Sequence, residues 1–255
     1  MPEAATRLRH VEHVMGTVFS FDIRDRPTSA IRRALAEAVD HLHRVDAVFS
    51  TYRPDSHISR LGRGETRLED CPPEVREVLS LCAQATSTSD GWFSVVAAGT
   101  LDPSGLVKGW ATEKASQLLY DAGARHTCVN GGGDLQLRGP AGPGTPWRIG
   151  IAHPLRPGRL ATVITVGHDL AVATSGTAER GAHIVDPHHG GPADTFASLT
   201  LVGPRLTMTD AYATAAFARG HEAPEWLRTL DGYEALAILP DGREWRSPSF
   251  SRYGS

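Results

Sequence analysis

Apolar residues in the first third of the chain alternate with the period of a strand and then recur with the period of a helix. They fall on every second position near the end of Thr17–Ile23, which predicts a strand with one buried face. From Ser29 to about Phe49 they recur every three or four positions, which predicts a long helix with Ser29 as its N-cap. Pro72 and Pro73 then predict the start of a second helix, because proline is tolerated in a first helical turn.

The second half of the chain changes from helical spacing to short β runs. A third helix is predicted from about Lys108 to Ala122, where Gly123 ends it. Six runs that follow this helix are predicted strands: 127–129, 134–137, 147–152, 160–166, 170–173 and 196–202. A final helix pair and a strand close the chain. The Pro- and Gly-rich stretch 139–146 lies between two of these runs, so we interpret it as a hairpin loop. Helices that lie mostly early in the chain and strands that lie mostly late predict an α+β fold with a largely antiparallel sheet.

Composition narrows the class of protein. A chain of 255 residues that is 40% hydrophobic and 22% charged can form a substantial core, and we expect one domain over residues 1–255. The net charge of −3, without an extended basic surface, argues against nucleic-acid binding. Residues 1–16 show neither a signal-peptide nor a lipoprotein pattern, and no run has membrane-spanning length, so we expect a cytoplasmic protein without a membrane anchor. Cys71, Cys82 and Cys128 are odd in number and widely spaced, which favours isolated thiols over disulfides or a zinc site.

Oxygen-bearing side chains near the end of the chain indicate a cation site. Asp210 and Thr214 lie four residues apart in a segment with helical spacing, so their side chains project from the same face. A hard cation takes oxygen ligands and usually retains a substrate phosphate among them, which points to chemistry on a nucleotide or pyrophosphate. The alternative is structural: Asp210 favours the helix dipole, and Thr214 bonds back to the preceding turn.

Two turns contain features that suit an anionic ligand. The glycine-rich turn 130–134 lets backbone amides approach a ligand closely, although a plain connection between strands explains it equally well. The Gly-x-Gly-x-x-Gly pattern followed by a helix is absent, which excludes a Rossmann dinucleotide site. The turn 174–176 offers two hydroxyls that suit either phosphate binding or an ordinary turn.

Among the 12 histidines, His183 is the candidate base. It begins a short apolar stretch, and Asp186 follows three residues later as a carboxylate that can orient an imidazole. The histidines that we interpret as solvated or structural are His41, His43, His57, His188 and His189. His188 and His189 lie in a predicted turn, and contact with a metal is an alternative role for them.

Seven short motifs follow one another along nearly the whole chain. They are Met15-Gly16-Thr17; Ser50-Thr51-Tyr52 with Ser56, Ile58, Ser59 and Leu61; Asp102-Pro103-Ser104-Gly105 with Lys108-Gly109-Trp110-Ala111; Asn130 with Gly132-Gly133-Asp134; Ala173-Thr174-Ser175-Gly176; His183-Ile184 with Asp186-Pro187, Gly190 and Pro192; and Asp210 with Ala213-Thr214. In this order they resemble the ApbE family of FAD:protein FMN transferases, also called flavin-trafficking proteins. The resemblance implies an ApbE-like, T-fold-related architecture with the active site in a cleft between two lobes.

The resemblance also implies roles for single residues. Asp210, Thr214 and the backbone carbonyl of Gly105 match magnesium ligands, and His183 matches a histidine that touches FAD and serves as the candidate catalytic base. The positions that match FAD contacts or the lining of the FAD pocket are Met15, Asp102, Lys108, Asn130, Gly132, Gly133, Asp134, Thr174, Ser175 and Gly176. The segment 91–107 is shorter than usual in the family, so Trp92 and Phe93 either replace the missing flavin contacts or are simple core aromatics.

The implied reaction is magnesium-dependent transfer of the FMN moiety of FAD to a Ser or Thr hydroxyl of an acceptor protein, with release of AMP. Acceptors of this family carry a short Asp-Gly-x-Ser/Thr-Gly-Ala-Ser/Thr motif. Two alternatives stay open. One is an FAD pyrophosphatase, in which water replaces the protein hydroxyl, and the other is a non-catalytic FAD-binding protein.

Overall fold

The computed structural model describes residues 7–96, 99–177, 181 and 184–254. Its centre is an eight-stranded sheet with the order β1-β2-β3-β4-β7-β8-β9-β10, and neighbouring strands pair antiparallel throughout. The strands of this sheet are β1 (Leu8–Val14), β2 (Thr17–Ile23), β3 (Thr127–Gly131), β4 (Asp134–Arg138), β7 (Leu170–Gly176), β8 (Ser198–Gly203), β9 (Glu234–Ile238) and β10 (Glu244–Arg246). β5 (Trp147–Ala152) and β6 (Leu160–Val166) pair with each other in a separate two-stranded sheet. The predicted α+β class with a largely antiparallel sheet is confirmed.

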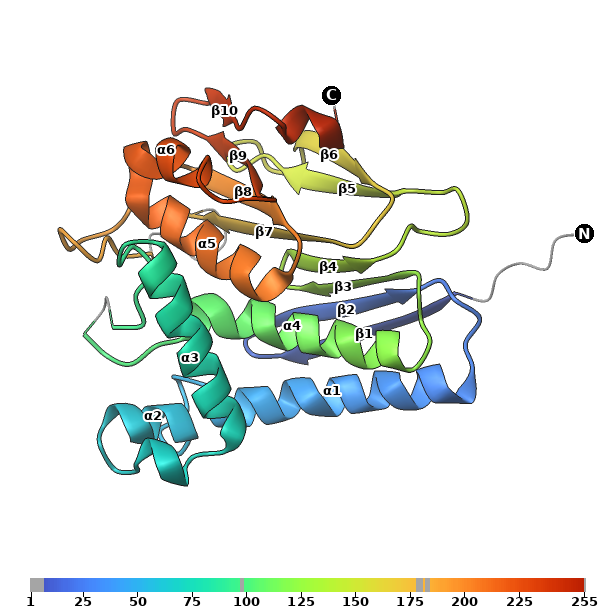
Figure 1. The fold of residues 1–255 in the computed structure, drawn as a ribbon, viewed down its shortest axis with the longest axis horizontal. Helices are drawn as coiled ribbons and strands as arrows, with labels where there is room; N and C mark the ends of the chain where they lie inside the picture. Colours follow the sequence, from blue (N-terminus) through green and yellow to red (C-terminus); the bar gives the residue numbers. More distant parts are fainter. Residues whose placement is uncertain (1–6, 97–98, 178–180, 182–183, 255) are drawn as a thin grey trace, which may run out of the picture.

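Three long helices cover one face of the large sheet (Figure 1). They are α1 (Ser29–Phe49), α4 (Ser104–Asp121) and α5 (Leu206–Arg219), and α3 (Pro73–Thr88) packs against α4 and α5. The shorter elements are α2 (His57–Gly62), α6 (Ala223–Leu227) and three 3₁₀ turns at Leu68–Asp70, Gly220–Glu222 and Phe250–Tyr253. No helix in the part of the chain that the structure describes is long and apolar enough to cross a membrane.

β7, β8 and β9 bury both of their faces, which explains why apolar residues occupy consecutive rather than alternating positions in them. Along β7, Ala171 and Ala173 belong to the core under the helices, whereas Leu170 and Val172 belong to a second core. This second core lies against the two-stranded sheet and includes Trp147, Ile151, Ile164, Val166 and Phe250. Small residues on the helix side allow α5 to approach the sheet closely, and the site described below lies along this helix.

Several predicted boundaries are corrected by local contacts. The N-cap of α1 is Thr28 rather than Ser29, because the Thr28 hydroxyl accepts a hydrogen bond from the Ile31 amide at 3.2 Å. The third helix begins at Ser104 rather than near Lys108, and the Asp102 carboxylate accepts a hydrogen bond from the Ser104 amide at 2.9 Å. The strand predicted from 196 begins at 198, and the single final strand is two strands, β9 and β10. Cys71 and Cys82 are buried, Cys128 is partly buried, and all three are free thiols.

The interpretation of residues 139–146 as a hairpin loop is wrong. β4 and β5 flank this stretch, but β4 pairs with β7, and β5 pairs with β6. The loop therefore carries the chain from the large sheet to the small one. β1 and α2 were not predicted, because the apolar residues of β1 do not alternate and α2 is only six residues long.

Candidate active site

A cavity of about 710 Å³ lies where α4 and α5 meet several turns at strand ends, and its size is typical of small-molecule sites. The hairpin turns β1–β2 and β3–β4, the end of β7 and the turn after β5 all contribute to its walls. The predicted site residues that line it are Met15, Trp92, Phe93, Asp102, Gly105, Lys108, Gly132, Gly133, Asp134, Thr174, Ser175, Gly176, Asp210 and Thr214. These residues come from six separate stretches of sequence that converge on one space.

α4 and α5 cross closely at one wall of the cavity. The Gly109 amide donates a hydrogen bond to Asp210 Oδ2 at 2.9 Å, and Asp210 is 5% exposed. A Cβ atom on Gly109 would lie 2.7 Å from Asp210 Cβ, and one on Gly105 would lie 3.5 Å from Thr214 Oγ1. The absence of these two side chains on α4 therefore brings the backbone near Gly105 next to the two predicted cation ligands of α5.

The donors at this crossing fit Mg²⁺. Asp210 supplies a carboxylate and Thr214 a hydroxyl, and both line the cavity. In a regular helix the Gly109 amide would donate to the Gly105 carbonyl, so Asp210 competes with that carbonyl for one donor. Within the described ranges, no cluster of three His, Cys, Asp or Glu side chains is arranged to hold a metal. One carboxylate with neutral oxygen donors suits Mg²⁺, which usually completes its shell with water and substrate phosphate.

An ion pair between a partly buried lysine and a buried carboxylate lies beside this crossing. Lys108 Nζ is 2.6 Å from Asp134 Oδ2, and the Asp134 side chain is 2% exposed. The other carboxylate oxygen, Asp134 Oδ1, accepts a hydrogen bond from the Thr174 amide at 2.8 Å. Asp134 thus joins α4, β4 and β7, and it holds the Lys108 ammonium at the cavity wall.

The glycine-rich turn is both a hairpin connection and a wall of the cavity. Gly132 and Gly133 have φ values of +60° and +97°, which a tight hairpin turn requires at both central positions. Asn130 is the one predicted contact in the described chain that does not line the cavity, and its Oδ1 accepts a hydrogen bond from the Gly133 amide at 2.8 Å. Asn130 therefore stabilises the turn without lining the cavity.

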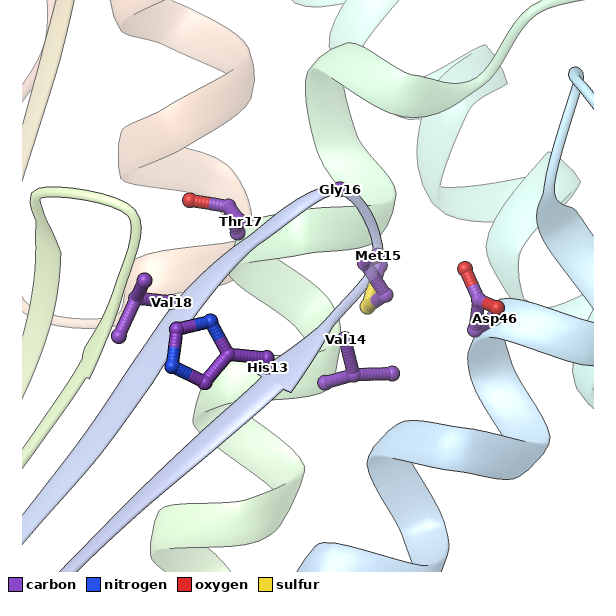
Figure 2. Close-up of a pocket in the computed structure, with 7 residues that line it drawn as sticks. All are labelled: His13, Val14, Met15, Gly16, Thr17, Val18 and Asp46. Atoms are coloured by element: carbon purple, nitrogen blue, oxygen red, sulfur yellow. The ribbon is translucent and has the colours of Figure 1, made fainter.

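Met15 lies at the tip of the β1–β2 hairpin, and Figure 2 shows it across from Asp46 of α1. A second hollow of about 490 Å³ lies on this side, and Met15 and Gly16 line both hollows. A Cβ on Gly132 would lie 2.5 Å from Thr17 Oγ1, so the two hairpin turns pack directly on each other. This contact holds Met15 at the edge of the larger cavity.

The two aromatic residues of the shortened segment differ in their surroundings. Phe93 is 2% exposed and belongs to the main core, close to Gly105. The Trp92 ring packs against the His188 ring with a centroid distance of 4.4 Å, so it joins the segment 91–107 to the turn that follows Pro187. Both residues also line the cavity, so core packing and a place in the site coexist.

His183, the predicted base, lies outside the described residues. Ile184 and Val185, which follow it in the chain, line the cavity. Asp186 accepts hydrogen bonds from the amides of His188 at 2.8 Å and His189 at 3.0 Å, and its Oδ2 lies 3.0 Å from His189 Nδ1. Burial raises the pKa of the Asp186 carboxyl, but these hydrogen bonds outweigh it and hold that pKa below its ordinary value. The carboxylate predicted to orient His183 thus stabilises the following turn.

Some cavity residues were not predicted as site residues from the sequence. Pro154, in the turn after β5, reaches the cavity from the small sheet, and Ser198 reaches it from the start of β8. Tyr52 lines the cavity with 97% of its surface exposed. Tyr52 belongs to the motif Ser50-Thr51-Tyr52, and the resemblance implied no role for it. Only the folded arrangement of distant segments brings these three residues together.

A sequence model described as the ApbE family matches residues 15–99 and 97–237. The chain belongs to the ApbE family. A relative from Treponema pallidum named FAD:protein FMN transferase is 34% identical over 161 residues, which cover 56% of this chain and 44% of that protein. One of the same name from Escherichia coli strain K12 is 28% identical over 165 residues, covering 60% of this chain and 47% of that protein. The chain spans about half the length of the curated relatives it matches.

Solved structures share the fold of this ApbE family member along almost its whole length. The flavin transferase ApbE from Vibrio cholerae has a TM-score of 0.84 at 22% identity, covering 98% of this chain and 99% of that chain. The ApbE protein from Thermotoga maritima has a TM-score of 0.83 at 21% identity, covering 98% and 100% of the two chains. The ApbE-like fold predicted from the resemblance is confirmed.

Proposed function

We propose that this protein is a magnesium-dependent FAD:protein FMN transferase. It moves the FMN moiety of FAD onto a Ser or Thr hydroxyl of an acceptor protein and releases AMP. The observation that carries the proposal is the α4–α5 crossing, where Thr214 lies beside Gly105 and Asp210 beside Gly109 at a cavity of about 710 Å³. The names of the relatives supply the reaction class, and the acceptor is expected to carry the family's short Ser/Thr motif.

The residues around the crossing suit the diphosphate of FAD. Lys108 places a positive charge at the cavity wall, and the β3–β4 turn presents backbone at Gly132 and Gly133 without side chains. Asp210, Thr214 and the Gly105 carbonyl would hold Mg²⁺ against the phosphate oxygens. Bound there, the ion supplies stabilisation of the negative charge that develops during phosphoryl transfer.

The transfer forms a bond between the acceptor oxygen and the phosphorus of the FMN moiety, and it breaks the bond from that phosphorus to the bridging oxygen. That oxygen leaves with AMP. We assign to His183 the removal of the proton from the acceptor hydroxyl, since the adjoining Ile184 and Val185 line the cavity. Such a base contributes about 10²- to 10⁴-fold in rate, so His183→Ala should slow transfer by that factor and leave FAD binding mostly intact.

Mass spectrometry of an acceptor protein tests the proposal. The acceptor, with its Ser/Thr motif, is incubated with the protein, FAD and MgCl₂, and its intact mass is measured together with AMP. The proposal predicts an added FMN and one AMP per modified acceptor, and neither product when EDTA is present or the target Ser/Thr is replaced by Ala. Free FMN and AMP formed without acceptor would instead establish a pyrophosphatase, and unchanged FAD would establish a binding protein. His189→Ala is the matched control for His183→Ala.

A further inference from the structure

The first turn of α5 is held by two buried side chains from other elements. The Leu206 amide donates to Gln136 Oε1 of β4 at 2.9 Å, and the Thr207 amide donates to Glu113 Oε2 of α4 at 2.9 Å. Gln136 is 0% exposed and Glu113 is 5% exposed. The first amides of a helix have no acceptor within that helix, so these two contacts fix the place where α5 begins.

The Glu113 carboxylate is engaged entirely with the start of α5. Its Oε2 also accepts from the Thr207 hydroxyl at 2.7 Å, and its Oε1 accepts from Arg205 Nε at 2.6 Å. A negative charge at this position interacts favourably with the positive end of the helix dipole. In the described chain Glu113 is not part of the cavity wall, so these contacts act on α5 rather than on a bound ligand.

Glu113 continues the row of α4 residues that forms the cavity crossing. Gly105, Gly109 and Glu113 are spaced four residues apart on α4, so they lie on one helix face. Along α5 they meet Thr214, Asp210 and Thr207 in reverse order, as expected for antiparallel helices. The helices thus touch at three successive levels: two carry the proposed cation ligands, and the third is the Glu113 contact.

We propose that Glu113, together with Gln136, is a positioning residue for the cation site. It sets the register of α5 against α4, and therefore the separation of Asp210 and Thr214 from the Gly105 carbonyl. This inference rests on the proposed function, because it concerns the Mg²⁺ site used there. A helix advances about 1.5 Å per residue, whereas Mg²⁺ requires ligand distances of about 2.0–2.1 Å. A slip of less than one residue between the helices would therefore separate the ligands.

Replacement of the carboxylate by an amide tests this role directly. Glu113→Gln keeps the side-chain volume but removes the charge that Arg205 and the start of α5 contact. The matched control is Glu77→Gln. Glu77 also bonds to α4 through Trp110 Nε1 at 3.1 Å and Lys114 Nζ at 2.9 Å, and both of these partners belong to α4 rather than α5. Free Mn²⁺ is measured by electron paramagnetic resonance as the ion is titrated into each protein with saturating FAD, which gives a binding constant without reference to turnover.

Glu113→Gln should raise the Kd for Mn²⁺ by about 10- to 100-fold, as outer contacts of metal ligands commonly do, while Glu77→Gln stays close to wild type. Gln136→Met, which removes the acceptor of the Leu206 amide, should raise the Kd in the same direction, and it provides the test if Glu113→Gln does not fold. Wild-type affinity in both variants would overturn the inference and leave the proposed function standing. Absence of Mn²⁺ binding by the wild-type protein would instead overturn the metal site, and this inference with it.

Discussion

Replacing Gly109 with alanine tests how closely α4 and α5 approach at the proposed cation site. The added Cβ would lie 2.7 Å from Asp210 Cβ and 2.8 Å from the carbonyl oxygen of Leu206. Neither neighbour is the far end of a flexible side chain, so the helices must move apart by roughly 0.7–1 Å to reach ordinary contact distance. This movement would also lengthen the hydrogen bond from the Gly109 amide to Asp210, which is 2.9 Å.

The expected net effect is a loss of about 2 kcal/mol in the free energy of unfolding. Overpacking of a rigid core costs about 1–3 kcal/mol, and weakening a buried hydrogen bond to a carboxylate costs up to about 1.5–3 kcal/mol. Alanine offsets about 1 kcal/mol of this through its higher helix propensity. For a chain of this size, a net loss of about 2 kcal/mol lowers Tm by about 4–8 °C.

Differential scanning calorimetry of Gly109→Ala and Gly105→Ala separates the clash from helix propensity. Both substitutions lie on α4, and Gly105, as the second residue of this helix, gains no more helix propensity than Gly109 does. At Gly105 the nearest atoms to the added Cβ are Phe93 Cε2 at 3.3 Å and Thr214 Oγ1 at 3.5 Å, so the residue fits after a small adjustment. We expect Gly105→Ala to unfold at or slightly above the wild-type temperature. Equal Tm values for the two variants would refute the close helix crossing.

Three further predictions concern charged groups. Asp210→Asn should abolish Mg²⁺-dependent AMP release while the exposed control Asp241→Asn retains it, as product chromatography with and without Mg²⁺ would show. Asp134→Asn removes the carboxylate that lies 2.6 Å from Lys108, so it should raise the KM for FAD and lower the free energy of unfolding by about 2 kcal/mol or more, as kinetics and urea titration would measure. Burial lowers the pKa of His41 from 6.5 to about 4, so the folded chain binds fewer protons than the unfolded chain between these values. The free energy of unfolding should therefore fall by about 1–2 kcal/mol from pH 7 to pH 5, and His41→Leu should lack this component in urea titrations at the two pH values.

Segments with a strict hydrophobic period could be predicted from sequence almost to the residue, as Thr17–Ile23 and Ser29–Phe49 show. β1 could not, because its apolar residues break the alternation. Val11 is 56% exposed on the outer side, while the inner side carries the polar pair His10 and Glu12, whose Nε2 and Oε2 atoms are 3.1 Å apart. An edge strand with one neighbour tolerates this pattern, since its ladder to β2 supplies the stability that the apolar period does not.

Pairings between distant segments could not be predicted from local pattern. The chain leaves β4, forms the small sheet and returns as β7 beside β4, so the turn residues 139–146 contain no trace of the true partner. The ion pair of Lys108 with Asp134 could not be predicted from local pattern either. Each residue was predicted as a ligand contact, but their contact with each other depends on the packing of α4 against β4. The predicted site residues that the structure describes surround one cavity, Asn130 excepted, but the motifs did not indicate which of them contact one another.

The consecutive residues 108–110 of α4 each contact a different neighbouring element. Lys108 contacts Asp134 of β4, Gly109 meets Asp210 of α5, and the Trp110 ring packs against the Phe49 ring of α1 at 5.9 Å between centroids. Successive residues of a helix point about 100° apart, so three adjacent positions serve three different neighbours. α4 is consequently buried on several sides, and its orientation about its own axis cannot change without moving the lysine from the cavity wall or the glycine from the crossing. A single turn of helix thereby fixes the sheet, the proposed cation ligands and the first helix relative to one another.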